Sequence, residues 1–501
     1  MRTLLAALVA LLALAAGVLP ATALPSLDAT SDTATDVGAL LTDAAPGPGG
    51  FSSDNMDYLG TLAADASGIG ARVHVMPDGE RRFYVSGAQG LTIYNVDNPA
   101  FPVVLGRFEI PNFENEDVSV SADGRTVLMS EFTVDAYYYV FTVSDPVVAT
   151  GQVLITLEGQ ILLEGAHIVD CIDDACDWVY GSDGDIYDMT DKSDPQLVGD
   201  WKDVVAAQIG SRPGGGHNVE VIGDRDLDGD GDLERVLTTD TTPIVMLDVT
   251  DPQVPQVISQ SNKADHGDYG TQYQHNNKVL DFEAYVPRDT TTDPVVLDAD
   301  GLPTNLAPGE IMLGNGETNF TGTCGSGSGP LASWSIADWE DGTQFEAIEV
   351  FRPESGTYDG DGNAAANALG CSGHWFDTRQ PTATEIASGI AAEGDIMVAA
   401  GWYEHGTRVF HVDGRTGHIS QLAFFQPVAG SASAAHWVVD GERTFIYTVD
   451  YVRGGDVLRF DGSTTEAIPS HEDRALSWTL ASDLATELSA EARYLCYLAI
   501  Q

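Results

Sequence analysis

The chain has 501 residues, of which 76 are acidic and 23 are basic, and its formal net charge is −53. A surface this acidic repels nucleic acid and anionic lipid, so we expect neither as a partner. The acidic residues are spread along the whole chain instead of forming a tail, which favours a solvation role, as in proteins kept soluble in high salt.

The N-terminus has the pattern of a secretory signal. Residues 1–23 combine Arg2, the apolar stretch Leu4–Val18 and a small-residue cleavage site at Ala21–Ala23. Residues 24–50 are rich in Thr, Asp, Ala, Gly and Pro, and we predict a disordered leader there. No later stretch is long and apolar enough to cross a bilayer. We therefore expect a secreted or cell-surface monomer without a membrane span.

One short phrase recurs along the chain: an apolar run rich in β-formers that ends at Asp-Pro or, in the first copy, at Asp-Asn-Pro. It reaches Pro99 as Ile-Tyr-Asn-Val-Asp-Asn-Pro, Pro146 as Phe-Thr-Val-Ser-Asp-Pro and Pro252 as Met-Leu-Asp-Val-Thr-Asp-Pro. Pro cannot donate to a strand ladder and Asp bonds its own backbone in a turn, so each phrase predicts a strand that ends in a turn. With looser copies included, the Asp of the phrase falls at Asp97, Asp145, Asp194, Asp251, Asp338, Asp413 and Asp461.

This repeat predicts an all-β fold, a seven-bladed β-propeller over residues 51–470. The first three of these Asp residues are 48 or 49 residues apart and the last two are 48 apart, and a four-stranded blade takes roughly 40–50 residues. Met56–Leu62 precedes the first blade and resembles the outer strand Val104–Phe108. We predict that it completes blade 7 and removes a free edge. Residues 471–501 are expected to form a C-terminal tail packed on the propeller.

Five Cys residues in an exported chain predict disulfides. Cys171 and Cys176 bracket a tight loop between the first two strands of blade 3, where a bond would clip the hairpin. Cys324 and Cys371 lie in loops that we expect on the same face, which makes a second bond reasonable. Cys496 has no assigned partner.

A His residue begins five of the predicted inner strands: His167, His217, His275, His374 and His436. Blades 1 and 2 have Arg72 and Asp117 at that position. Carboxylates form a second column where the second strand turns into the third: Glu131, Asp183, Asp240, Glu317, Glu404 and Asp450. The end of the second strand lies beside the start of the first in an antiparallel pair, so both columns share one face of the propeller.

Two interpretations of the columns compete. In the structural one, each His donates a ring N–H to the carboxylate of its own blade and pins the loop, as in WD-repeat propellers. In the other, the imidazoles converge at the channel mouth and bind a divalent transition metal, with carboxylates orienting the rings. Three to five neutral imidazoles suit Zn, Cu, Fe or Ni better than Ca or Mg.

Glu404 and His405 are the candidate catalytic residues beside such a metal. They belong to the phrase Gly-Trp-Tyr-Glu-His-Gly-Thr-Arg on a strand-end loop of the same face, where they could act as acid or base. In the alternative interpretation, this phrase only packs and braces the loop.

A separate Asp-rich run predicts a calcium site. Asp226, Asp228, Asp230 and Asp232 alternate with Gly at the spacing of a calcium loop. Position twelve is Leu237 instead of a bidentate Glu, and the run falls in a predicted hairpin of blade 4. Acidic surfaces also produce such runs without binding any ion.

The chain resembles the LVIVD-repeat propellers, a family of mostly uncharacterised exported proteins. The resemblance rests on the units Leu91–Pro99, Tyr138–Pro146 and Ile244–Pro252 and on the opening Ser53–Gly60. It implies a propeller fold, a surface or extracellular location and no established reaction.

The sequence leaves two classes of function open. One is a His-lined site for a metal or small ligand, with metal-dependent oxidoreductase or hydrolase chemistry if the protein is an enzyme. The other is a non-enzymatic adhesion or scaffold propeller that binds protein or glycan through the long insertions at Pro287–Pro308 and Pro353–Leu369. No nucleophile elbow, phosphate loop or dinucleotide motif occurs in the sequence.

Overall fold

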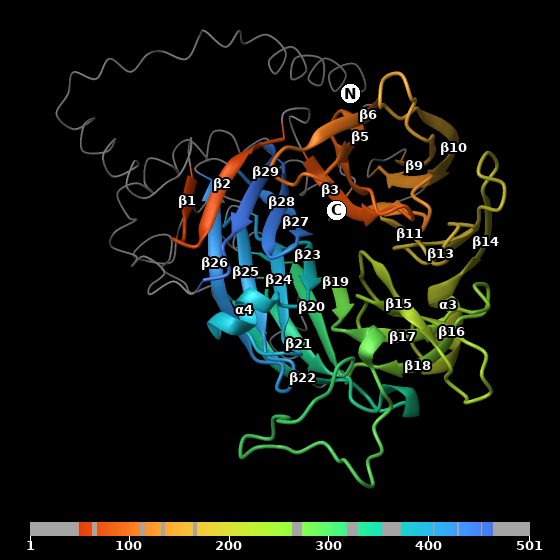
Figure 1. Ribbon diagram of the computed structural model, residues 1–501. Coiled ribbons are helices and arrows are strands. Elements are labelled where there is room, and N and C mark those ends of the chain that lie inside the picture. The colour runs from red at the N-terminus through yellow and green to blue at the C-terminus, as the bar shows by residue number, and fades with distance from the viewer. Residues whose placement is uncertain are drawn as a thin grey trace, which may run out of the picture. The chain divides into compact units, whose positions relative to one another are not determined.

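The computed structural model describes residues 50–62, 68–110, 116–131, 136–163, 168–262, 273–317, 329–352, 372–403, 405–427, 430–451 and 453–463 (Figure 1). These residues form seven antiparallel sheets that follow one another in a ring as the blades of a β-propeller. The predicted fold class and the number of blades are therefore confirmed.

Blades 1 to 6 each hold four consecutive strands, and blade 7 takes its fourth strand from the N-terminal segment. Blades 1 and 2 hold β3 (Gly68–Val75), β4 (Arg81–Gly87), β5 (Gly90–Asn95), β6 (Val103–Glu109), β7 (Val118–Val120), β8 (Thr126–Ser130), β9 (Ala136–Val143) and β10 (Ile155–Leu163). Blades 3 and 4 hold β11 (Val169–Cys171), β12 (Trp178–Gly181), β13 (Asp185–Asp188), β14 (Gln196–Asp200), β15 (Val219–Arg225), β16 (Glu234–Thr239), β17 (Val245–Asp248) and β18 (Gln256–Gln260). Blades 5 to 7 hold β19 (Tyr273–Val279), β20 (Ile311–Glu317), β21 (Leu331–Ser335), β22 (Glu346–Phe351), β23 (Phe376–Arg379), β24 (Ile396–Gly401), β25 (Thr407–Val412), β26 (Ile419–Pro427), β27 (Ala432–Asp440), β28 (Arg443–Asp450) and β29 (Gly454–Phe460).

Short helices lie in the connections: α3 (Trp201–Ile209), α4 (Ala383–Ser388), η2 (Phe282–Ala284) and η3 (Trp339–Asp341). Within the described residues, none of the helices has the length and apolarity needed to cross a membrane. The first strands of neighbouring blades contact one another, as β3 does with β27 and with β7. These first strands therefore line the central channel.

The N-terminal segment closes the ring. β2 (Met56–Thr61) pairs with β29, from Met56 opposite Phe460 to Thr61 opposite Asp456, as predicted for blade 7. β1 (Gly50–Ser52) adds an unexpected fifth strand to blade 6 by pairing with β26, and it begins at the last residue of the predicted leader. The two strands cover the outer edges of two neighbouring blades, which would otherwise expose unpaired N–H and C=O groups.

The recurring Asp residues work as the repeat predicts. Asp97 Oδ1 accepts the Arg81 backbone N–H at 2.8 Å, at the end of the third strand of blade 1. In the turn after the third strand of blade 4, Asp251 Oδ1 accepts the N–H of Gln253 at 3.1 Å. These side-chain bonds satisfy backbone donors where the ladder stops and fix the turn to the fourth strand.

The hydrophobic core lies between neighbouring blades. All six residues of β24 are buried, because blades cover both faces of its sheet. Met397 and Ala399 of blade 6 belong to the same buried cluster as Trp437 and Ile446 of blade 7. Burying a side chain as large as Met397 or Ile446 contributes about 1.5–3 kcal/mol to stability. The blade interfaces therefore provide much of the stability that holds the channel-lining strands in place.

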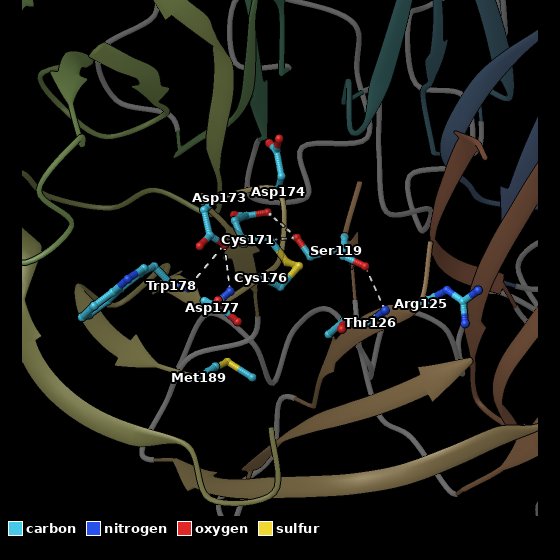
Figure 2. Close-up of a disulfide and its surroundings, with 12 residues drawn as sticks. Ser119, Arg125, Thr126, Cys171, Asp173, Asp174, Cys176, Asp177, Trp178 and Met189 are labelled. Atoms are coloured by element: carbon cyan, nitrogen blue, oxygen red, sulfur yellow. Dashed lines mark hydrogen bonds between the residues drawn. A yellow bond between two sulfur atoms is a disulfide. The ribbon is translucent and has the colours of Figure 1, made fainter. Parts of the chain in front are cut away.

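A disulfide joins Cys171 to Cys176 across the loop between β11 and β12, as predicted (Figure 2). Inside this loop, Asp173 Oδ1 accepts the backbone N–H groups of Asp177 at 2.8 Å and Trp178 at 3.4 Å. The Cys171 N–H donates to Ser119 Oγ of blade 2 at 3.1 Å, which ties the clipped hairpin to its neighbour. Cys324, Cys371 and Cys496 lie outside the described residues, as do the predicted signal and the C-terminal tail.

Candidate metal centre

Three of the predicted His residues come together at one end of the central channel. His217 lies two residues before β15, His275 lies in β19 and His374 lies two residues before β23. The pairing of β19 with β20 shifts register between Gln274 and Asn276, and such a bulge re-aims the side chain of the extra residue. The ring centroids of His217 and His275 are 4.5 Å apart, and those of His275 and His374 are 4.0 Å apart.

Two carboxylates complete the group. Glu116 Oε2 lies 2.9 Å from His275 Nε2 and 3.5 Å from His374 Nε2. Glu317 Oε2 lies 3.9 Å from His217 Nε2. We call these five residues the imidazole–carboxylate cluster. It contains two overlapping sets, Glu116–His275–His374 and His217–His275–Glu317, and within each set the potential ligand atoms lie within 4.8 Å of one another.

The cluster is almost closed to solvent, since His275 and His374 are 0 % exposed and Glu116 is 2 % exposed. Charged groups buried in this way need partners. The Ser433 carbonyl accepts the N–H of His374 Nδ1 at 2.8 Å, which leaves Nε2 on the side of Glu116. Burial by itself lowers the pKa of His374, but the negative charges of Glu116 and Glu317 and the Ser433 carbonyl outweigh it and raise that pKa.

Two tyrosines, one from blade 6 and one from blade 7, hold the carboxylates of the cluster. The Tyr403 hydroxyl donates to Glu317 Oε1, and the Tyr451 hydroxyl donates to Glu116 Oε1 at 3.4 Å. The Tyr403 ring also lies 4.8 Å from the His374 ring. Tyr403 has a φ of 38°, a backbone conformation that costs a non-glycine residue about 1–3 kcal/mol. A conformation of this cost is kept where the surroundings over-determine it, here at a residue that bonds the cluster.

Two carboxylates of the second column, Asp240 and Asp450, bond the backbone. Asp240 accepts the N–H groups of His217 and Asn218 at 2.8–2.9 Å, and Asp450 accepts the Ser431 N–H at 2.9 Å. Burial raises the pKa of Asp240 well above its ordinary value, although the two N–H groups oppose the rise. Asp240 and Asp450 therefore hold the starts of strands, but by a different contact from the ring N–H bond that the structural interpretation predicts. For Asp240 and Asp450, the described contacts run through backbone N–H groups rather than through the imidazoles.

Two other predicted site residues, His436 and His405, belong to neither set of the cluster. His436 lies in the middle of β27, where its ring packs 5.8 Å from the Phe83 ring, and burial lowers its pKa to about 4. The predicted strand start in blade 7 was three residues late, because it is Ser433 that reaches His374. Burial lowers the pKa of His405 to about 3, and neither set of the cluster includes it. His167 and Glu404 lie outside the described residues.

Sequence reasoning missed Glu116, Tyr403 and Tyr451. Glu116 is the neighbour of Asp117, which the alignment selected for blade 2, and one residue of register decides which side chain reaches the cluster. Tyr403 stands inside the phrase that suggested Glu404 and His405. In both loops the sequence therefore pointed to the right segment, but the residue selected, Asp117 or Glu404, is one position after the residue that contacts the cluster.

Farther along the channel, each blade contributes one titratable side chain at or next to its first strand: Arg72, Asp117, Asp170, Glu220, Lys278, Asp377 and His436. We call these seven residues the channel belt. Arg72 pairs with Asp117 at 3.1 Å. The charge of Asp117 chiefly raises the pKa of Arg72, and those of Glu220 and Asp170 add to the rise against the effect of burial. Side chains from blades 1 to 4 thus act on one another across the channel.

The Asp-rich run forms the predicted hairpin between β15 and β16. Asp226, Asp228 and Asp230 place carboxylate oxygens within 4.8 Å of one another, and all three are exposed. Asp226 Oδ2 accepts the Gly231 N–H at 3.1 Å, and Asp230 Oδ1 accepts the Asp232 N–H at 2.8 Å. These bonds fold the loop by local contacts, so calcium binding stays a prediction.

Comparison with known proteins finds only distant structural similarity. No family model and no curated protein matches the chain. Among solved structures, the chain is similar to the Cps50 (Swd1) β-propeller domain of Myceliophteria thermophila, with 11% identity over 81% of this chain and 99% of that chain and a TM-score of 0.42. It is also similar to Sqt1 of Saccharomyces cerevisiae, with 11% identity over 81% of this chain and 88% of that chain and a TM-score of 0.40. The protein is a seven-bladed β-propeller by its own sheet topology, and the resemblance to LVIVD-repeat propellers stays a prediction.

Proposed function

We propose that this protein binds a divalent transition metal at the imidazole–carboxylate cluster. The proposal is supported by a buried group of three imidazoles and two carboxylates from blades 2, 4, 5 and 6. They form two overlapping sets, and the potential ligand atoms within each set lie within 4.8 Å of one another. Ligand atoms that share one Zn²⁺, with bonds of about 2.0–2.2 Å, stand roughly 3–4 Å apart. Small rotations of the side chains would therefore bring either set into coordination.

The donor types narrow the choice of metal. Each set offers two imidazoles and one carboxylate, the combination used by non-haem iron(II) sites with open positions and close to that of catalytic zinc sites. The Ser433 carbonyl and the two tyrosines would orient His374 and the carboxylates from outside the coordination sphere. Such a centre supports metal-dependent oxidoreductase or hydrolase chemistry.

Elemental analysis tests the proposal. Protein prepared without metal-affinity resin is dialysed against Fe²⁺, Zn²⁺, Cu²⁺ or Ni²⁺, and the bound metal is counted per chain. We expect at least one of these ions to remain at about one per chain. A chain that retains none of the four after dialysis would contradict the proposal. For variants of the clustered imidazoles, His418→Ala is the matched control, because His418 is an exposed imidazole that pairs with Glu349 away from the cluster.

We propose export as the setting of this function. It is supported by the signal pattern of residues 1–23 and by the Cys171–Cys176 disulfide, a bond typical of oxidising compartments. N-terminal sequencing of the mature protein tests it, and an intact Met1 in the functional protein would argue against it.

A non-enzymatic binding module is the second candidate. The long connection between η2 and β20 exposes Val286 at 73 %, Val296 at 51 % and Leu297 at 58 %, side chains that a protein or glycan partner could cover. Removing the metal separates the two candidates: partner binding through this connection would survive in metal-free protein, whereas function at the cluster would not.

A further inference from the structure

Three charged residues follow the three clustered imidazoles at one constant interval. Glu220, Lys278 and Asp377 stand three residues after His217, His275 and His374, on the first strands of blades 4, 5 and 6. At about 3.3 Å per residue they lie one level farther along the channel, within roughly 10 Å of the rings. The same three strands thus carry both the imidazoles and a trio of opposite charges.

Lys278 bridges the other two. Its Nζ lies 3.3 Å from Asp377 Oδ1 and 3.7 Å from Glu220 Oε1. Burial lowers the pKa of Lys278, but Glu220 and Asp377 outweigh it and raise that pKa. Asp377 also accepts the Trp437 backbone N–H through Oδ2 at 3.0 Å. The bridge therefore connects blades 4, 5 and 6 and extends to blade 7.

Such a bridge matters because β15, β19 and β23 belong to three different sheets. Among the described residues, no ladder of backbone hydrogen bonds joins these three strands to one another. Their spacing therefore depends on packing between blades and on side-chain contacts across the channel. Without the ammonium group, Glu220 and Asp377 would face each other as like charges, and their repulsion would favour separation of blades 4 and 6. Lys278 is one of four Lys residues in the chain.

We infer that Lys278 is the positioning residue of the imidazole–carboxylate cluster: by holding Glu220 and Asp377 together, it sets the distances between the His217, His275 and His374 rings. This inference rests on the proposed metal function for its consequence, but the spacing of the imidazoles can be measured without metal. The effect is transmitted along the strands over three residues and requires no contact between Lys278 and a metal.

The test compares K278M with K278R and with K192M. The last is the matched control, because Lys192 pairs with Asp177 in blade 3 and removing it breaks an ion pair outside the channel. Cobalt(II) serves as the probe, since its visible absorption reports ligand geometry. We expect K278M to weaken cobalt binding by about 10–100-fold, the usual cost of losing a group that orients ligands, and to change the absorption spectrum. K278R should restore both to near the wild-type values, and K192M should match wild type. Wild-type affinity and spectrum in K278M would overturn the inference.

A metal-free measurement separates this inference from the proposed function. In protein labelled with ¹⁵N-histidine, the ring resonances of the three imidazoles, assigned with His→Ala variants, should move in K278M and stay in place in K192M. If wild type binds no cobalt but these resonances still move, the metal proposal fails and the positioning role stands. Unmoved resonances overturn the positioning role. Should K278M fail to fold, D377N weakens the same bridge while an amide oxygen still accepts the Trp437 N–H, and a smaller change in the same direction is expected.

Discussion

The cluster and the Asp-rich hairpin are both groups of metal-binding residue types, yet they are built in opposite ways. The cluster draws on residues between Glu116 and His374 in the sequence, and its members are buried. The hairpin is a continuous run whose carboxylates are exposed and accept N–H groups from the same loop. Burying three imidazoles and two carboxylates costs stability unless they are paired or coordinated, whereas an exposed acidic loop costs little. The burial of the cluster is therefore the stronger sign of a function.

The largest expected effect separates the two groups directly. His275 belongs to both sets of the cluster, so His275→Ala should lower transition-metal affinity by more than about 100-fold, beyond the 10–100-fold typical of outer partners. Calcium binding at the hairpin should be unchanged. Titration calorimetry with both ions measures this. Equal loss in His418→Ala, or retained affinity in His275→Ala, would contradict the assignment of the cluster.

A smaller effect is expected for the tyrosine that holds Glu317. Tyr403→Phe removes the hydroxyl that donates to Glu317 Oε1 while keeping the ring beside His374. We expect a loss of metal affinity of about tenfold. The control is Tyr187→Phe, which removes a hydroxyl that donates to Asp185 in blade 3. An unchanged affinity in Tyr403→Phe would mean that Glu317 needs no partner to stay in place.

The pH dependence should distinguish His436 from the clustered imidazoles. The folded-state pKa of His436 is about 4, and an unfolded His titrates near 6.5. Between these values the unfolded chain binds the proton and the folded chain does not, so the stability owed to a neutral His436 is lost as the pH falls from about 6.5 to 4. His436→Asn should make the melting temperature of metal-free protein fall less steeply over this window. If the melting temperature falls equally steeply with pH in wild type and variant, His436 does not contribute to this loss of stability.

For His374, the same linkage between pKa and stability predicts the opposite pH dependence. The pKa of this residue is raised, so the contribution of its charged pair to stability is fully present below about 6.5 and is lost as the pH rises through the raised value. ¹⁵N chemical shifts of the His374 ring in metal-free protein should show a titration midpoint above about 6.5, the ordinary value for His. A midpoint at or below about 6.5 would contradict the electrostatic environment described for the cluster.

The smallest effect belongs to the hairpin. If calcium binds Asp226, Asp228 and Asp230, millimolar calcium should raise the melting temperature by a few degrees through mass action. Asp228→Asn should cancel the rise and leave transition-metal binding at the cluster unaffected. A melting temperature that responds neither to calcium nor to a chelator would leave the hairpin as an acidic surface turn.

Sequence reasoning succeeded where the signal repeats. The Asp-Pro phrases at Pro99, Pro146 and Pro252 predicted strands, turns and seven blades, because each turn satisfies its own backbone within a few residues. The closure of blade 7 by Met56–Leu62 followed from the likeness of one strand to another. The added strand β1 could not be foreseen in the same way, since its pairing with β26 depends on where the chain lies after the ring has closed.

The cluster shows most clearly which features follow from the sequence and which depend on the tertiary structure. The sequence by itself determined that His217, His275 and His374 stand at or near the starts of inner strands in a circular array, because local turn and strand chemistry sets that register within a blade. Tertiary structure alone decided that His275 and His374 meet Glu116 and that His217 meets Glu317. It also decided that His436 packs against Phe83. A bulge at His275 and a shift of three residues in blade 7 decide which side chain reaches the cluster. Such shifts are set by packing between blades, which no local sequence pattern records.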